Sequence, residues 1–254
     1  ADEATGAATA GDDVARGAAD PDDASSPGDD EPGIDPVTRA LRTRDDALGS
    51  VEREMGKRLK RILADEQNEV LDTLRRGGTV DLADVLPEAD EHADRYAIAI
   101  GADLDAAAGH GAVAAGGARS TSCDPLAGEL GRALVQPLRV RVERSFHDSD
   151  GDVEEITERL RALYREWKGQ RIGAAVRHYT AAAYSIGVAD ALPAGAPQRW
   201  IVDPSSCAAC PDCDDNALAG DVAGGEAFPT GDTRAPAHPD CRCLVVAVTA
   251  LDTA

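Results

Sequence analysis

Cys207-Ala-Ala-Cys210-Pro-Asp-Cys213 and His238-Pro-Asp-Cys241-Arg-Cys243 are two short arms that hold five of the six cysteines within 37 residues. Thiolate and imidazole are preferred ligands of tetrahedral zinc. A CxxC arm facing an HxxCxC arm across a Gly/Pro/Asp-rich loop is typical of small zinc knuckles. The spacing therefore predicts one structural zinc. A disulfide-pinned loop and free buried thiols are the two alternatives.

The expected first shell is Cys210, Cys213, Cys241 and either His238 or Cys243. His238 precedes Cys241 by three residues, and Cys241 and Cys243 flank one arginine, so all three can turn inward on a tight bend. Two β-prone segments, 200–203 and 244–248, flank the arms. They predict a two-stranded ribbon with the zinc at its open end, and the metal would supply stability that an isolated ribbon lacks.

The region before the knuckle is predicted to be helical. Apolar residues recur from Val37 to Leu74 in steps of three, four and seven, which indicates one long amphipathic helix closed by Gly77-Gly78. Further helices are expected within 80–118, over Leu126–Phe146 with Pro137 inside, and from an Asp152 N-cap to Ile186 with a break near Gly169. Part of the long apolar stripe is expected to face a partner.

These patterns predict a mainly α protein, an elongated helical bundle followed by a small C-terminal two-stranded β-ribbon zinc knuckle. The expected domains are a disordered acidic arm (1–35), a helical domain (36–195) and the Cys/His knuckle (196–254). Residues 1–35 carry eleven Asp/Glu against one Arg, which accounts for −10 of the net charge of −21. The basic residues on the first helix, Arg53, Lys57, Lys60 and Arg61, are interpreted as a solvated face, and a nucleic-acid-binding stripe is the alternative.

The sequence has no run of 18 apolar residues and no apolar leader, so neither a membrane span nor a secretory signal is expected. These features predict a cytosolic or intracellularly assembled protein, in which thiols stay reduced and metal binding is favoured over a disulfide. The lone Cys123 outside the arms is interpreted as a spectator.

The C-terminal third resembles the Mu F-like family of tailed-phage minor head (head morphogenesis) proteins. The residues that carry the resemblance are Trp167-Lys-Gly-Gln-Arg171, Ile186-Gly187, Trp200, Cys210-x-x-Cys213-x-x-Asn216, Gly220, Phe228-Pro229-x-Gly231 and Pro236-Ala-His238-Pro-Asp-Cys241-Arg-Cys243. The chain departs from the family pattern in two places. His178-Tyr179 replaces an acidic position, and Cys207 is an extra cysteine, so either Cys207 or Cys210 can pair with Cys213 at the metal.

The resemblance implies a non-enzymatic, low-copy minor capsid protein. Such a protein would assemble at the portal vertex, inside the head of the virion, after synthesis in the host cytoplasm. Its implied partners are the portal protein and, in addition, the major capsid or scaffold protein. Contact with packaged DNA is not favoured by the charge.

Two alternative functions follow from the cysteines. A zinc-dependent enzyme of the nucleobase-deaminase type would need a His or Cys ligand followed two residues later by a catalytic Glu, and none of the five histidines has one. A zinc-ribbon nucleic-acid-binding protein would need a basic knuckle. Here Arg234 and Arg242 stand among seven acidic residues, a field that repels phosphate.

Overall fold

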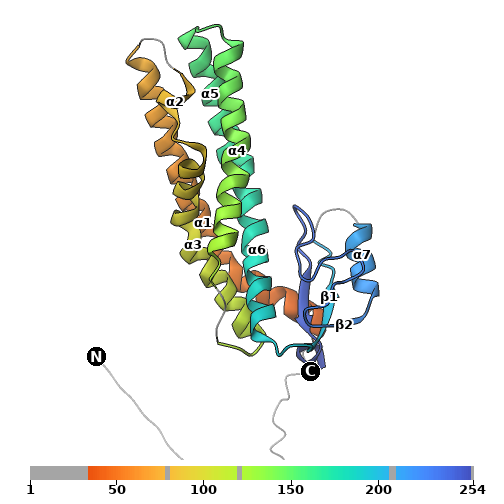
Figure 1. Cartoon of the computed structure of the whole chain (residues 1–254). Coiled ribbons are helices and arrows are strands. Elements are labelled where there is room, and N and C mark those ends of the chain that lie inside the picture. The colour runs from red at the N-terminus through yellow and green to blue at the C-terminus, as the bar shows by residue number, and fades with distance from the viewer. Residues whose placement is uncertain (1–33, 78–80, 119–121, 206–209, 253–254) are drawn as a thin grey trace, which may run out of the picture. The chain divides into compact units, whose positions relative to one another are not determined.

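The computed structural model describes residues 34–77, 81–118, 122–205 and 210–252, which all belong to one compact unit, Ile34–Ala254. The acidic arm predicted for residues 1–35 therefore lies outside the described residues, except for Ile34 and Asp35. The unit is mainly helical and ends in a small antiparallel sheet (Figure 1), as the sequence predicted. Among the described residues, no helix is long and apolar enough to cross a membrane.

The elements follow one another as a helical region and then a short α/β module. They are α1 (Pro36–Arg75), α2 (Leu82–Val85), α3 (Ala89–Ala114), α4 (Asp124–Asp148), α5 (Val153–Glu166), the π-helical turn η1 (Trp167–Arg171), α6 (Ile172–Ala191), β1 (Pro197–Ile201), α7 (Pro211–Leu218), β2 (Asp221–Ala223), β3 (Leu244–Ala247) and α8 (Thr249–Asp252).

Helix α1 is the longest element, about 60 Å at 1.5 Å per residue. The Asp35 carboxylate caps it by accepting from the backbone N–H of Thr38 at 2.9 Å, and Pro36 occupies the first turn, where a missing N–H costs little. Its apolar stripe is buried from Leu48 to Leu74 inside the unit. Helices of the same chain therefore cover these residues, and the expectation that part of the stripe faces a partner stays a prediction, because Val37 at the start of the stripe is exposed.

Helix α3 lies at the centre of the helical region, where it packs against α1, α4 and α6. Its contacts with α4 and α6 are unusually close because glycines stand at the crossings. A Cβ added at Gly187 of α6 would meet the Ala108 carbonyl oxygen at 1.8 Å, and one added at Gly131 of α4 would meet that of Ala93 at 2.3 Å. Small residues thus allow the helices to pack closely in a chain in which only 3 % of the residues are aromatic.

The predicted break near Gly169 is a change of helix type and not an interruption. Helix α5 starts at Asp152, whose carboxylate accepts from the N–H groups of Glu154 and Glu155, so the predicted N-cap is confirmed. Helix α5 then continues through the π-helical turn η1 into α6. The indole N–H of Trp167 donates to the Leu134 carbonyl at 3.1 Å, which fixes this turn against α4.

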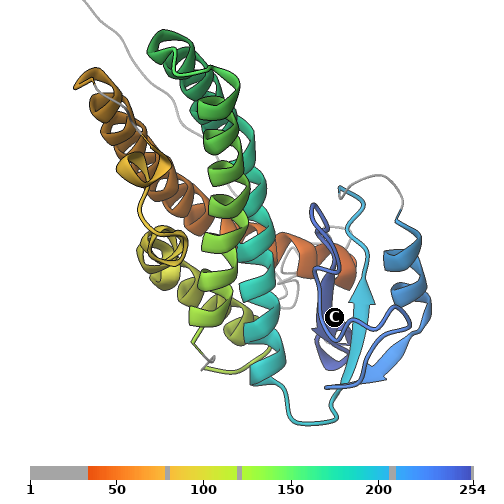
Figure 2. The same cartoon turned by 45° about the horizontal axis from the view of Figure 1, so that its top comes forward.

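The sheet has three strands in the order β2-β1-β3, with β1 antiparallel to both neighbours. The prediction of a two-stranded ribbon is wrong in strand number, although β1 and β3 do pair as expected, with Trp200 opposite Val245. Strand alternation gives the β1–β3 pair two apolar faces. Ile201 and Leu244 join the core of the helices, and Trp200 and Val245 join a second core. Figure 2 shows the strands between α6 and α7.

Candidate metal centre

The first cysteine arm is held by a short helix that the sequence analysis did not predict. Cys210 is the N-cap residue of α7, and Cys213 lies in its first turn. Pro211 suits the first helical position, and Asp212 and Asp214 complement the positive end of the helix dipole. These residues turn the CxxC sequence into a helical N-terminus, which places both thiols on the side facing the second arm.

The second arm is a tight turn that leads directly into β3. The N–H of Cys241 donates to the His238 carbonyl at 3.1 Å, and Asp240 has a φ of 64° within this turn. Cys243 immediately precedes Leu244, the first residue of β3. The turn therefore directs His238, Cys241 and Cys243 toward α7, as the sequence spacing predicted.

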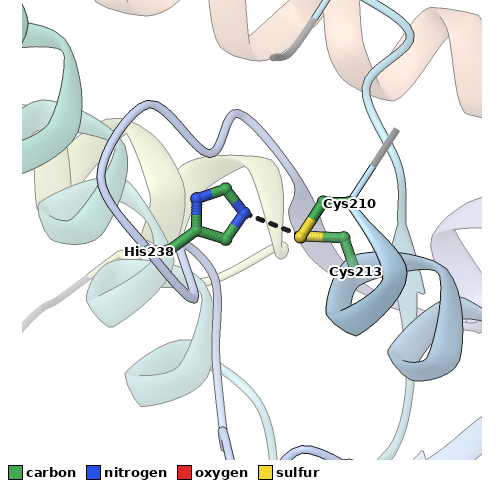
Figure 3. A group of neighbouring side chains, drawn as sticks. All are labelled: Cys210, Cys213 and His238. Carbon is green, nitrogen blue, oxygen red and sulfur yellow. Dashed lines mark hydrogen bonds between the residues drawn. The ribbon is translucent and has the colours of Figure 1, made fainter. Parts of the chain in front are cut away.

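Five donor side chains gather in two groups of three that share Cys213. One group is Cys210, Cys213 and His238 (Figure 3), and the other is Cys213, Cys241 and Cys243. Within each group all donor atoms lie within 4.8 Å of one another. A Cys/His cluster that could hold a metal ion is therefore present near the C-terminus.

The individual distances have the size that a tetrahedral centre requires. The Cys213 Sγ lies 3.7 Å from the Cys241 Sγ and 3.4 Å from the His238 Nε2. Metal–sulfur bonds of about 2.3 Å and metal–nitrogen bonds of about 2.0 Å, at tetrahedral angles, separate two sulfurs by about 3.8 Å and a sulfur from a nitrogen by about 3.5 Å. These two distances from Cys213 are thus close to those expected around one tetrahedral ion.

The imidazole of His238 already has the orientation of a metal ligand. Its Nδ1 lies 2.8 Å from the Pro239 carbonyl oxygen, which can only accept, so Nδ1 carries the proton of the neutral ring. The lone pair of Nε2 is then directed at the Cys213 sulfur (Figure 3). A backbone carbonyl on the second nitrogen is the usual partner of a metal-bound histidine.

The thiols of the cluster differ in pKa because they lie close enough to form hydrogen bonds with one another. Hydrogen bonding from the Cys243 thiol lowers the pKa of Cys241 to about 5, whereas burial raises the pKa of Cys213 to about 12. The hydrogen bond to the Cys241 thiolate also raises the pKa of Cys243. One thiolate surrounded by thiols that donate to it is an arrangement in which a cation can replace the shared protons.

The three buried cysteines belong to the small second core of the C-terminal module. Around them pack Trp200 and Phe228, whose rings meet edge to face with centroids 5.2 Å apart. Asn216 is fully buried, and its Oδ1 accepts from both the N–H and the hydroxyl of Thr230, at 3.1 and 2.9 Å. These packing contacts and hydrogen bonds thus stabilise the two cysteine-bearing arms, which have few apolar side chains of their own.

A buried ion-pair network joins this module to α1. Arg44 of α1 is 2 % exposed and donates to the Asp203 carboxylate at 2.6 Å and to the carbonyl oxygen of Arg242, the residue between Cys241 and Cys243. Arg242 itself pairs with Asp45 at 2.6 Å. The backbone between two candidate ligands is therefore anchored to the helical region.

Five of the six predicted ligands come together: Cys210, Cys213, His238, Cys241 and Cys243. Cys207 lies outside the described residues. Cys123 is buried at the N-terminus of α4, away from the cluster, with its pKa raised by burial to about 11. His178 lines a hollow together with Pro239 and Asp240.

Comparisons of the chain with models of protein families, with curated proteins and with solved structures found no match.

Proposed function

We propose that the C-terminal module binds one structural zinc ion. The supporting observation is the tetrahedral spacing of the donors around Cys213, with His238 already oriented by its backbone partner. Cys210, Cys213 and Cys241 supply three ligands, and His238 or Cys243 supplies the fourth. Four protein ligands complete the coordination of zinc and leave no position for water, which is the arrangement of structural sites.

We further propose that the protein is a non-enzymatic minor head protein of a tailed virus that assembles with the portal protein at the portal vertex. The proposal is based on the resemblance to Mu F-like proteins. It is supported by the positions of the residues that carry the resemblance, because Trp200, Asn216 and Phe228 pack or hydrogen-bond within the same small module as the cysteines. The residues that carry the resemblance would then form one folding unit together with the cysteines. The major capsid or scaffold protein is a further proposed partner.

Metal analysis tests the zinc. The full-length protein, purified with its thiols reduced, is expected to contain about one zinc per chain, and Cys213→Ser, which removes the donor common to both groups, is expected to contain almost none. Cys123→Ser is the matched control, since it also removes a buried thiol but leaves the cluster intact. A metal-free protein with reduced thiols would contradict the proposal.

Separate variants decide the fourth ligand. If His238 binds the ion, His238→Ala is expected to weaken zinc binding far more than Cys243→Ser, and the opposite order assigns the position to Cys243.

Co-expression tests the role in the head. The full-length chain is expected to co-purify with the portal protein encoded beside it and to be detected by mass spectrometry in purified virions. If the two proteins separate and virions lack the chain, the head-protein proposal is wrong, whatever the metal analysis shows.

A further inference from the structure

A basic groove runs between α1 and α6 on the surface of this acidic protein. Its basic side chains are Arg53, Lys57 and Lys60 from α1 and Arg177 from α6, all exposed, and Glu52 is the one acidic residue among the described residues that line it. The sequence predicted a solvated face for the α1 residues, with a nucleic-acid-binding stripe as the alternative. The structure adds Arg177, more than 110 positions away in the sequence, to the same groove.

The charge of this groove is opposite to that of the unit around it. Residues 1–33 carry ten acidic residues and one Arg, a net charge of −9, so residues 34–254 carry −21 + 9 = −12. The groove itself carries four positive charges and one negative charge. Glu52 also accepts a hydrogen bond from the Thr180 hydroxyl at 3.3 Å. The described lining residues therefore have an excess of three positive charges, which the adjacent Glu54 reduces to two, in a unit whose average charge is negative.

Most of these cations lack partners. Within the described residues Arg53, Lys60 and Arg177 form no ion pair, and Lys57 pairs with the exposed Glu54 at 2.7 Å. A second basic hollow, between α4 and α5, differs in this respect. There Arg141 pairs with Glu166 at 3.1 Å, and Arg159 pairs with Glu155 at 2.7 Å. Arg144 is the one cation of that hollow that forms no ion pair among the described residues, against three in the α1–α6 groove, so the α1–α6 groove offers more unneutralised charge to a ligand.

The arrangement of the cations favours an extended polyanion over a single phosphate. Arg53, Lys57 and Lys60 follow one another at helical spacing over about 10 Å of α1, so they form a row and do not converge on one point. One strand of duplex DNA presents roughly three phosphates over that length of its axis. None of the described residues that line the groove is aromatic, so these residues provide no platform on which unpaired bases could stack.

We propose that the α1–α6 groove binds the phosphate backbone of duplex DNA without sequence preference. Long flexible cations in a row contact phosphates and carry no base readout. Glycines at positions 49, 56 and 173 keep the groove free of further side chains. At Gly56 an added Cβ would meet nothing within 4 Å, so packing between the helices does not require this glycine. The knuckle, which is acidic, takes no part in this contact.

Fluorescence anisotropy with a labelled duplex of about 30 base pairs and mixed sequence tests the proposal on the full-length protein. Between about 50 and about 300 mM NaCl, log K is expected to fall linearly with log [NaCl], with a slope no steeper than about −3.6 for four contacts. The triple variant R53Q/K60Q/R177Q is expected to bind at least about tenfold more weakly and to have a slope near −0.9 for the remaining Lys57.

The matched control is R141Q/R144Q/R159Q, which removes the same net charge from the second hollow. It is expected to keep the affinity and slope of the unmodified protein. Circular dichroism spectra and melting curves verify that both variants fold, which is expected because every substituted side chain is exposed. Equal losses in both variants would show a general charge effect and overturn the assignment of the groove.

Three other outcomes also overturn the proposal. Absence of duplex binding at about 50 mM NaCl excludes the site, tighter binding of single-stranded DNA excludes a duplex ligand, and groove-dependent binding of polyglutamate without binding of DNA indicates an acidic protein partner. The proposal does not depend on the head-protein assignment or on zinc. Failure of portal co-purification or of metal analysis leaves it standing.

Discussion

Arg44 and Asp203 are 159 positions apart in the chain, yet their side chains form an ion pair of 2.6 Å that is almost inaccessible to solvent. Asp203 follows β1 and also accepts from the N–H and hydroxyl of Ser205. Arg44 in turn reaches the carbonyl oxygen between Cys241 and Cys243. One guanidinium therefore connects α1, the end of β1 and the backbone of the candidate metal centre.

Arg44→Ala is expected to destabilise the protein by about 3 to 5 kcal/mol, because it leaves the Asp203 carboxylate buried with a weaker partner. Chemical denaturation followed by circular dichroism measures this free energy of unfolding. Arg42→Ala, two residues away on the exposed side of α1, is the control and is expected to stay within about 0.5 kcal/mol. Equal effects of the two substitutions would show that the buried pair has no special role.

A double replacement tests whether the two buried charges interact directly. Arg44→Met combined with Asp203→Leu removes both charges, and the double variant is expected to be more stable than either single variant, since no charge remains buried alone. Additive losses in this cycle would contradict a direct interaction.

The two buried charged residues of α1 interrupt the apolar pattern of the sequence, and the helix prediction did not use these interruptions. The apolar stripe from Val37 to Leu74 has two steps of seven, Leu41 to Leu48 and Leu63 to Val70. Arg44 and Glu66 occupy the missing positions, and both are buried. A charged residue on the apolar face of a helix indicates a buried partner. The partners, Asp203 and His92, come from distant segments and could not be identified from spacing.

The sequence predicted the metal donors better than the architecture around them. Cysteine and histidine spacing directly encodes a local turn, so five of the six candidates came together. Helix α7 and strand β2 were missed because both are short, and because β2 exists only through its pairing with β1. The continuous helix across Gly169 was missed because Trp167 packing stabilises a π-helical turn that glycine propensity does not indicate.

Removal of the metal is expected to loosen the C-terminal module while the helices persist. The edge-to-face contact of Trp200 with Phe228 lies in the same core as three of the cysteines, so chelation should expose the indole. In a Trp167→Phe background Trp200 is the only tryptophan, and its emission should shift to the red on chelation and return with zinc. A parallel loss of far-ultraviolet helical signal would contradict this prediction.

The buried carboxylate of Glu66 is expected to make stability depend on acid pH. Burial alone would raise its pKa, but hydrogen bonds from His92, Tyr96 and Tyr164, at 2.8, 2.6 and 2.7 Å, outweigh it and hold the pKa below 4.5. A lowered pKa in the folded state contributes stability above about pH 4.5. That contribution is lost as the pH falls further, through the folded-state pKa.

Glu66→Gln is therefore expected to cost about 3 kcal/mol at pH 7 and to flatten the fall in stability below pH 4.5. Urea denaturation at a series of pH values measures both effects. The matched control is Glu69→Gln, which alters the exposed pair with Arg95 and is expected to cost less than about 1 kcal/mol. An unchanged pH profile in Glu66→Gln would show that this carboxylate does not carry the dependence.

The crossing of α3 and α6 gives the sharpest steric prediction. An added Cβ at Gly187 would lie 1.8 Å from the Ala108 carbonyl oxygen, a backbone atom that cannot move without separating the two helices. Gly187→Ala is expected to lower the free energy of unfolding by about 3 kcal/mol or more. Gly109→Ala is the control on the facing helix, where an added Cβ meets nothing within 4 Å. It should be neutral or stabilise by up to about 1 kcal/mol, because alanine favours helix. If both substitutions changed the melting temperature in the same direction, close backbone contact would not be what holds these helices together.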